Sequence, residues 1–281
     1  MDLPELQIVQ IEPWTRYEWL RHGFSTRFGG VSTAYGGHSL NLGWTKEDDA
    51  SAVKENRRRF VAAVSGDADF TLAGVRQIHS GITHVIRQAD GAREGRLTTP
   101  EGKAVLEGDG LMTDLPGVLL AVGTADCVPV LVVDVHKKAV AAFHAGWRGT
   151  AARIVEQGIE RMHQEYGSRP EDLTASIGPS IGPCCYSVGE EVHAQFASNF
   201  PYAQELFREV QAPDSPPELH LNLWEANRRQ LLAAGLEQAK VTVVADCTAC
   251  SRDLQGALRY FSHRGERGTA GRMLNVVGIA K

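Results

Sequence analysis

The sequence predicts a mixed α/β fold with many strands and a few covering helices. Apolar and β-branched runs separated by turn residues predict the strands, and apolar residues at helical spacing predict the helices. The chain has 281 residues, of which 43% are hydrophobic and 22% charged, so it can bury a sizeable core. Because no repeat or composition shift marks a boundary, we expect a single domain over residues 1–281.

The predicted elements follow one another closely along the chain. Strands are expected at residues 6–11, 21–26, 70–78, 83–87, 111–113, 118–122, 130–133, 139–143, 173–177, 241–244, 258–262 and 273–279. A capping box at Thr45 and Asp48 precedes a helical face of Val53, Phe60, Val61 and Val64. Further helices are expected from about Thr150, over 188–198 and over 223–234, where Gly235 ends the last one. Residues 91–108 and 211–217 are expected to form loops.

The charge balance argues against two classes of partner. The chain carries 29 Lys and Arg against 34 Asp and Glu, a net charge of −5, whereas nucleic-acid and anionic-membrane binders are usually basic. The longest apolar stretch, residues 117–135, contains Asp126 and Pro129 and predicts two strands joined by a turn. We therefore expect neither nucleic-acid binding nor membrane insertion.

Cysteine usage indicates a reducing compartment. The chain has five cysteines, an odd number, and Cys184 and Cys185 are adjacent. A disulfide scaffold fits this pattern poorly, and residues 1–5 show neither the basic nor the apolar part of a targeting peptide. We expect a cytoplasmic protein.

Three residues at predicted strand ends are candidate metal ligands. His79, Cys127 and His144 each lie beside small or turn residues, where side chains from different strands can converge. Two imidazoles and one thiolate match a catalytic zinc site with an open water position. Their separations of 48 and 17 positions match no local zinc motif, so two other interpretations stay open. The three can be ordinary core residues, or Cys127 can be a nucleophile with His144 or His79 as its base and Asp126 nearby.

The other cysteines leave further alternatives open. Cys247 and Cys250 form a C-x-x-C pair after a strand, but no second such pair exists to complete a zinc ribbon. The pair is either a redox dithiol or part of a turn. The Gly- and Pro-bounded segment 178–186 forms either a pocket wall or a tight connection.

Arginines near turns are candidate anion-binding residues. Arg27 precedes a Gly-Gly pair, Arg148 precedes a predicted helix, and Arg264 follows a predicted strand. Each can equally form a surface salt bridge. Arg57–Arg59 are expected on a solvated helix face, and the sequence contains no P-loop.

Several motifs together resemble the YfiH-like family, long labelled laccase-domain or polyphenol oxidase proteins. Its members are described as purine nucleoside phosphorylases. The matching blocks run from about residue 20 to 280 and are Arg27-x-Gly29-Gly30-Val31-Ser32, Ser39-Leu40-Asn41-Leu42, Gln77-x-His79, Asp109-Gly110, Thr124-Ala125-Asp126-Cys127-x-Pro129, His144-Ala145-Gly146-Trp147-Arg148-Gly149-Thr150, Ile177–Tyr186 and Gly271-Arg272-Met273.

The resemblance implies a fold, a metal and a set of activities. The implied fold is a layered α/β/β/α sandwich with mixed sheets, similar to Cys-His deamidase folds. The implied zinc ligands are His79, Cys127 and His144. The implied activities are phosphorolysis of adenosine, inosine, guanosine and methylthioadenosine, and hydrolytic deamination of adenosine. Purine nucleosides and phosphate would be the partners, and we predict no protein partner.

Roles for individual residues are hypotheses at this point. We expect Cys127, Asp126 and Arg148 to be catalytic, with Asp126 as the proton donor in deamination. We expect Arg27, Asn41, Arg148 and Arg264 to contact substrate, with Arg148 and Arg27 holding phosphate.

Three alternatives remain open. One is a Cys-nucleophile hydrolase linked to peptidoglycan precursor editing. Another is a copper-dependent polyphenol oxidase, although the ten histidines are scattered and no His-x-His pair occurs; copper can also substitute for zinc in vitro. The third is a non-catalytic interaction module stabilised by zinc.

Overall fold

Alternating side chains in the central strands cover both faces of two stacked sheets. A computed structural model describes residues 5–211 and 216–281. In strand β7 (Val118–Thr124), Leu120 and Val122 point between the sheets, whereas Leu119 and Ala121 point toward a helix. This is the period of two expected of a strand that is buried on both faces.

The first sheet is mixed and has the strand order β1-β2-β15-β7-β4. Its antiparallel and parallel strands are β1 (Ile8–Val9), β2 (Leu20–Ser25), β15 (Met273–Ile279), β7 and β4 (Thr71–Gly74). The second sheet is also mixed and has the order β14-β10-β8-β9-β6-β5. Its strands are β14 (Val241–Val243), β10 (Leu173–Ile177), β8 (Val128–Asp134), β9 (Ala139–Ala145), β6 (Gly110–Thr113) and β5 (Thr83–Val85).

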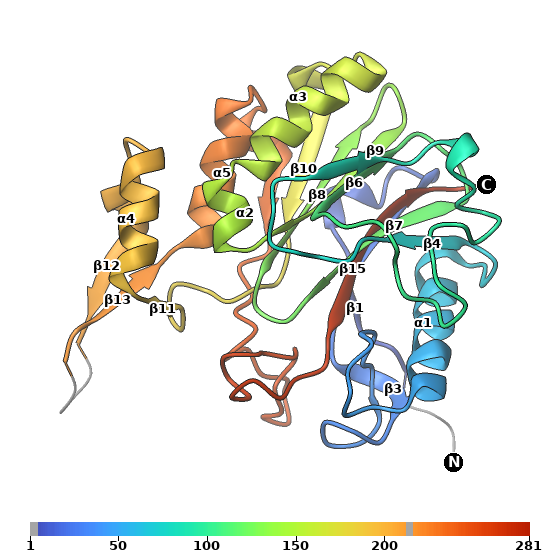
Figure 1. Ribbon diagram of the computed structural model, residues 1–281, viewed down its shortest axis with the longest axis horizontal. Coiled ribbons are helices and arrows are strands. Elements are labelled where there is room, and N and C mark those ends of the chain that lie inside the picture. Colours follow the sequence, from blue (N-terminus) through green and yellow to red (C-terminus); the bar gives the residue numbers. More distant parts are fainter. Residues whose placement is uncertain (1–4, 212–215) are drawn as a thin grey trace.

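Helices cover the outer faces of both sheets, which gives the layer order α/β/β/α (Figure 1). Helix α1 (Ala50–Ser65) packs on the first sheet, and α3 (Ile154–Tyr166) and α5 (Leu223–Ala233) pack on the second. The short helix α2 (Trp147–Ala151) directly follows β9. The four-layer sandwich implied by the resemblance is therefore the observed fold.

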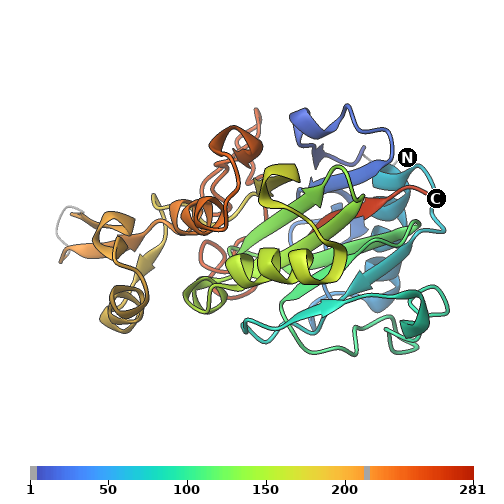
Figure 2. The same ribbon diagram turned by 90° about the horizontal axis from the view of Figure 1, so that it is seen from above.

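A small third sheet extends from one end of the sandwich. Figures 1 and 2 show helix α4 (Glu190–Asn199) together with this sheet at the end of the long axis. The sheet has the order β11-β13-β12. Its strands are β11 (Ser187–Val188), β13 (Glu218–Leu221) and β12 (Phe207–Val210). The remaining elements are β3 (Phe28–Ser32) and the 3-10 helices Glu12–Trp14, Gln88–Asp90, Pro170–Asp172, Ala203–Leu206 and Gln238–Lys240.

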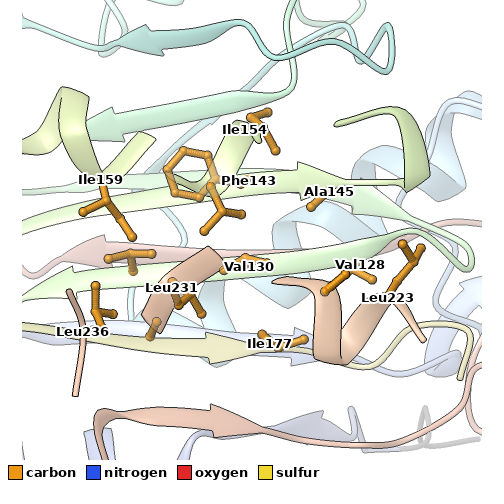
Figure 3. Packing of buried hydrophobic residues seen from close by; sticks show 14 of the residues in the cluster. Val128, Val130, Phe143, Ala145, Ile154, Ile159, Ile177, Leu223, Leu231 and Leu236 are labelled. Carbon is orange, nitrogen blue, oxygen red and sulfur yellow. The ribbon is translucent and has the colours of Figure 1, made fainter. Parts of the chain in front are cut away.

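The largest core cluster lies between the second sheet and its covering helices. Figure 3 shows Phe143 of β9 packed beside Ile154 and Ile159 of α3, with Leu231 of α5 over the neighbouring strand. Each of these side chains is at most 3% exposed. Burying a Leu, Ile or Phe side chain stabilises a fold by roughly 1.5–3 kcal/mol. This cluster therefore holds β8 and β9, whose ends lie at the candidate site, against the covering helices.

Three sequence predictions about elements are wrong. Asp49, not Thr45, caps α1 by accepting hydrogen bonds from the backbone N–H groups of Ser51 and Ala52. The helix expected from Thr150 is two helices, because Arg153 at φ +58° interrupts the α-helical conformation between α2 and α3. Residues 258–262 are not a strand; in this segment Leu258 forms only an isolated bridge to Arg252.

The structure tests one of the two expected loops, 91–108 and 211–217, in full and the other only in part. Residues 91–108 form turns and isolated bridges, as expected. Residues 212–215 of the second loop lie outside the described residues. Among the helices of the described chain, none is both long and apolar enough to cross a membrane.

Candidate active site

Strand pairing between β8 and β9 brings Cys127 and His144 together. The two strands form an antiparallel hairpin in which Val128 pairs with Ala145 and Pro129 with His144. Cys127 directly precedes β8, so its side chain lies at the end of the hairpin that carries His144. This proximity follows from register alone, because antiparallel partners lie about 5 Å apart.

His79 reaches the same place from the segment that follows β4. The Gln77 side chain holds that segment against β7: its amide donates to the Gly123 carbonyl at 2.8 Å and its carbonyl accepts from the Gly123 N–H at 2.7 Å. His79 itself adopts φ +59°, a left-handed conformation that non-glycine residues rarely use. The backbone is thus held in an uncommon conformation that directs the imidazole toward His144.

The three side chains form a compact cluster of candidate metal ligands. The His nitrogens and the Cys127 Sγ that face one another all lie within 4.8 Å. The rings of His79 and His144 meet edge to face with centroids 5.0 Å apart. His144 is buried, Cys127 is half-buried and His79 is exposed, so the cluster is accessible from one side. Such a donor set suits zinc with an open coordination position.

Asp109 orients two of these ligands. The His144 Nδ1–H donates to Asp109 Oδ1 at 2.8 Å, which leaves Nε2 for a metal or a proton. The same carboxylate accepts the His79 backbone N–H at 3.1 Å and the Ser80 hydroxyl at 2.7 Å. A buried carboxylate behind a ligating imidazole is typical of zinc sites, and this contact supports the fit of the site to that metal.

The electrostatics of the cluster favour a charged thiolate. Burial alone would raise the pKa of the Cys127 thiol, but the adjacent imidazoles of His144 and His79 lower it to about 6. Burial opposes the charged form of His144 as well, yet Cys127 and Asp109 raise the pKa of this imidazole above its ordinary value. A thiolate beside an imidazolium can act as a nucleophile, or it can bind a metal ion once the imidazolium releases its proton.

Asp126 shapes the turn before Cys127. Its backbone adopts φ +95°, and its carboxylate accepts hydrogen bonds from three groups. These donors are the hydroxyls of Thr248 and Ser262, each at 2.7 Å, and the backbone N–H of Arg264 at 2.6 Å. With its oxygens engaged as acceptors, Asp126 is placed as a support of the turn; its expected role as a proton donor stays a prediction.

A cavity of about 620 Å³ opens over the cluster, a volume typical of small-molecule sites. His79, Cys127 and His144 all line it. Its walls combine apolar and aromatic side chains with three arginines, namely Leu42, Trp44, Val75, Ala121, Ile181, Tyr186, Leu274, Arg57, Arg264 and Arg272. Arg264, one of the residues expected from sequence, is therefore at the site.

Asp126 also lines the cavity, whereas Arg148, Arg27 and Asn41 do not. Arg148 is exposed and stacks on Trp147 at 4.4 Å. Arg27 forms an ion pair with Glu266 at 3.1 Å and lies over the ring of Phe261. The expected contact of these two arginines with substrate stays a prediction.

Asn41 supports the cavity wall from behind. Its side chain is buried, and its Nδ2 donates to Asp48 Oδ2 at 2.7 Å. Its Oδ1 accepts the backbone N–H groups of Gly43 at 3.1 Å and Arg272 at 2.9 Å. Asn41 thus joins two wall segments, and its effect on substrate would be indirect.

Sequence reasoning missed two cationic residues of the wall. Arg57 was expected on a solvated face, but it lines the cavity and donates to the Leu42 carbonyl at 2.7 Å. Arg272 donates to the Ala270 carbonyl at 2.7 Å. A carbonyl partner orients a guanidinium without neutralising it, and among the described residues neither arginine has an ion pair assigned to it. Burial lowers the pKa of Arg57 to about 10, so the side chain stays charged at neutral pH.

A layered α/β/β/α fold with a His/Cys/His cluster at the base of a small-molecule cavity defines a class of candidate metal-dependent enzyme. The chain belongs to the family described as multi-copper polyphenol oxidoreductase laccase, whose family model matches residues 21–280.

Relatives agree with this assignment and with the resemblance to YfiH-like proteins. The chain is 37% identical over 270 residues to the purine nucleoside phosphorylase YlmD of Geobacillus stearothermophilus, covering 92% of this chain and 94% of that protein. It is 36% identical over 230 residues to adenosine deaminase RL5 of an unknown prokaryotic organism, covering 81% and 84%. The crystal structure of the Bacillus licheniformis hypothetical protein YfiH aligns with a TM-score of 0.82 at 32% identity, covering 98% and 96%.

Proposed function

We propose that this protein is a zinc-dependent purine nucleoside enzyme that carries out phosphorolysis and also deaminates adenosine. The observation that carries the proposal is the position of the His79, Cys127 and His144 cluster at the base of a cavity walled by arginines and aromatic rings. The names of the relatives, a purine nucleoside phosphorylase and an adenosine deaminase, support both activities. The substrates we propose are adenosine, inosine, guanosine and methylthioadenosine.

The metal would be held by His79, Cys127 and His144. Zinc fits this donor set, and when bound it would supply a Lewis acid with a free coordination position. Asp109 keeps His144 in the tautomer that presents Nε2, and the Asp126 turn keeps Cys127 in place. Copper would fit a His/Cys set as well, but among the described residues no candidate metal cluster holds more than two imidazoles, which disfavours a multicopper oxidase.

Phosphorolysis needs an anion site beside the sugar. An oxygen of hydrogen phosphate forms a bond to C1′ while the bond from C1′ to the base nitrogen breaks. The proton of hydrogen phosphate passes to the base, which yields the sugar 1-phosphate and the free base. Arg57 and Arg272 both line the cavity and supply positive charge to it. Guanidinium groups bind phosphate through paired N–H donors, so these two arginines would position phosphate for attack.

The purine would occupy the apolar part of the cavity. Leu42, Val75 and Ile181 give apolar walls, and the ring of Trp44 offers a stacking surface. In deamination, water replaces the 6-amino group and ammonia leaves. If one site serves both reactions, the nucleoside must bind in two orientations. In deamination C6 of the base would lie next to the His79, Cys127 and His144 cluster, and in phosphorolysis the sugar would lie next to it.

A second candidate function follows from the Cys127, His144 and Asp109 arrangement. The Cys127 thiolate lies beside the His144 imidazole, which in turn contacts the Asp109 carboxylate. These are the parts of a cysteine nucleophile, its base and the group that orients the base. This arrangement would serve a Cys-nucleophile hydrolase, which needs no metal. Chelator sensitivity separates the two functions.

The test is an assay of adenosine and inosine with and without phosphate, on zinc-loaded and chelator-treated protein. The proposal predicts free base that requires phosphate, and inosine formed from adenosine without it, both only in the zinc-loaded protein. Cys127→Ala should abolish both activities, whereas His136→Ala, an exposed histidine outside the cavity, should not. Full turnover after metal removal would assign Cys127 as a nucleophile instead. No turnover in the zinc-loaded protein would overturn the proposal.

A further inference from the structure

Four cysteines outside the cavity meet at one point. Cys184 and Cys185 lie in the segment between β10 and β11, whereas Cys247 and Cys250 follow β14. Their Sγ atoms all lie within 4.8 Å of one another, and those of Cys184 and Cys250 are 3.6 Å apart. The second cysteine pair that the C-x-x-C segment lacks in sequence is therefore supplied by adjacent residues from a distant loop.

Backbone contacts hold the two segments side by side. Ser180 forms a parallel bridge with Cys247. The Thr248 N–H donates to the Ser180 carbonyl at 3.1 Å, and the Ser180 N–H donates to the Asp246 carbonyl at 3.2 Å. The proximity of the four thiols thus follows from a short ladder that extends the neighbouring strands β10 and β14.

Backbone donors point at the most buried of the four sulfurs. The Gly182 N–H donates to Cys247 Sγ at 3.2 Å, and the Ala249 N–H donates to the same sulfur. A donor two residues after the first cysteine of a C-x-x-C pair arises when the turn folds around its sulfur. Such donors stabilise negative charge on a thiolate, which a metal ligand must carry.

We propose that Cys184, Cys185, Cys247 and Cys250 form a second metal site, which binds zinc through four thiolates. With Zn–S bonds of about 2.3 Å, tetrahedral geometry places the sulfurs about 3.8 Å apart, close to the separation of Cys184 and Cys250. Four thiolates in such proximity repel one another unless a cation lies between them. Because all four ligands come from the protein, the site is closed and structural, in contrast to the open His79, Cys127 and His144 cluster.

The site would stabilise the wall behind the cavity. Thr248 lies between two of its ligands and donates through Oγ1 to Asp126 Oδ1 at 2.7 Å. The Ile181 N–H donates to the Asp126 carbonyl at 2.8 Å, and Ile181 lines the cavity. Zinc bound by the four cysteines would join both segments on which the turn before Cys127 rests. The inference does not depend on which reaction the cavity supports.

The first experiment counts zinc in protein purified under reducing conditions. We expect about two zinc ions per chain in the parent protein and about one in either Cys127→Ala or the double variant Cys184→Ser/Cys250→Ser. Zinc content that is unchanged in the double variant would overturn the site. The proposal would also be overturned if the parent protein, purified without reductant, contained disulfides among these four cysteines and no zinc bound to them.

A second measurement leaves the four cysteines intact. The Cys127→Ala variant retains all four cysteines of the proposed second site. In this variant Co²⁺ should give the intense thiolate-to-metal charge-transfer bands of a four-sulfur site. A Co²⁺ spectrum without such bands would overturn the proposal even if the double variant fails to fold. Catalytic activity enters neither experiment, so failure of this proposal and failure of the proposed function are distinguishable.

Discussion

Gly146 lies across the end of the β8–β9 hairpin from Cys127, one step beyond the paired Val128 and Ala145. A Cβ built on Gly146 would lie 2.9 Å from Cys127 Sγ and 3.5 Å from a ring carbon of His79. The backbone of Gly146, at φ −61° and ψ 173°, is open to any residue. The absence of a side chain is thus required by the neighbouring thiol and not by backbone conformation.

Gly146→Ala is therefore expected to weaken metal binding while leaving the fold intact. The added methyl group must displace Cys127 Sγ, and a ligand shifted by a few tenths of an ångström loses coordination geometry. Competition with a chelator of known zinc affinity measures the effect. Gly81→Ala is the matched control, because its Cβ would meet Ala152 at an ordinary 3.5 Å. Equal zinc affinities in the two variants would contradict the explanation.

Asp109→Asn is expected to lower zinc affinity at the same cluster by about 10- to 100-fold, the usual effect of removing a carboxylate behind a ligating histidine. The amide keeps an oxygen near His144 but removes the charge that raises the basicity of the imidazole. Zinc titration with a competing chelator checks this. Asp114→Asn is the control, since Asp114 is an exposed acid just beyond the other end of β6. The role assigned to Asp109 is wrong if both variants bind zinc as the parent does.

Arg57→Gln is expected to raise the KM for phosphate about 10- to 100-fold with little change in adenosine deamination. Hydrogen bonds to a charged group contribute about 1.5–3 kcal/mol, and only phosphorolysis uses the anion. Arg58→Gln is the matched control on the same helix, since Arg58 pairs with Glu55 on the exposed face. Steady-state kinetics of both reactions decide the matter. A parallel loss of both activities would indicate a structural role for Arg57 and not a phosphate contact.

His22 makes the stability of the protein depend on pH. Burial lowers the pKa of its imidazole to about 4, from an ordinary value of 6.5, and its Nδ1 accepts the Ile11 N–H at 3.4 Å. Between these two pH values the unfolded chain binds more protons than the folded one. The free energy of unfolding should therefore rise with pH across pH 4–6.5, by up to about 3 kcal/mol, and fall as the medium is acidified.

Urea unfolding at several pH values tests the role of His22. The variant His22→Gln, which keeps a hydrogen-bond acceptor, should show a smaller loss of stability between pH 6.5 and pH 4 than the parent. His38→Asn serves as the control, because His38 is exposed and asparagine tolerates its φ of +46°. Identical pH dependence in His22→Gln and the parent would show that other groups are responsible.

The regular strands could be predicted from the sequence better than the irregular segments could. Strands such as β15 were predictable because a short run of apolar and β-branched residues is a local signal. The break at Arg153 was not, since an arginine at positive φ has no distinctive sequence pattern. The segment 258–262 has the apolar content of a strand, but tertiary packing of Tyr260 and Phe261 buries it as a loop.

Some residues of the candidate site could likewise be predicted from the sequence and others could not. Cys127 and His144 were predictable as neighbours because a short hairpin joins them. Arg57 was missed because three successive arginines cover more than one side of a helix, and sequence does not show which one meets the cavity. The four-cysteine cluster depends on the parallel pairing of β10 with β14, strands separated by more than 60 residues, and no local spacing encodes that contact.

The backbone conformations of His79 and Asp126 determine when the ligand set is assembled. Both residues have positive φ, and each such conformation costs on the order of 1–3 kcal/mol. Hydrogen bonds from the His79 backbone to Asp109 and from Thr248 and Ser262 to Asp126 stabilise them without any metal. The strain is therefore introduced while the chain folds. An arriving ion meets a rigid, preorganised receptor and loses little of its binding energy to ordering the protein.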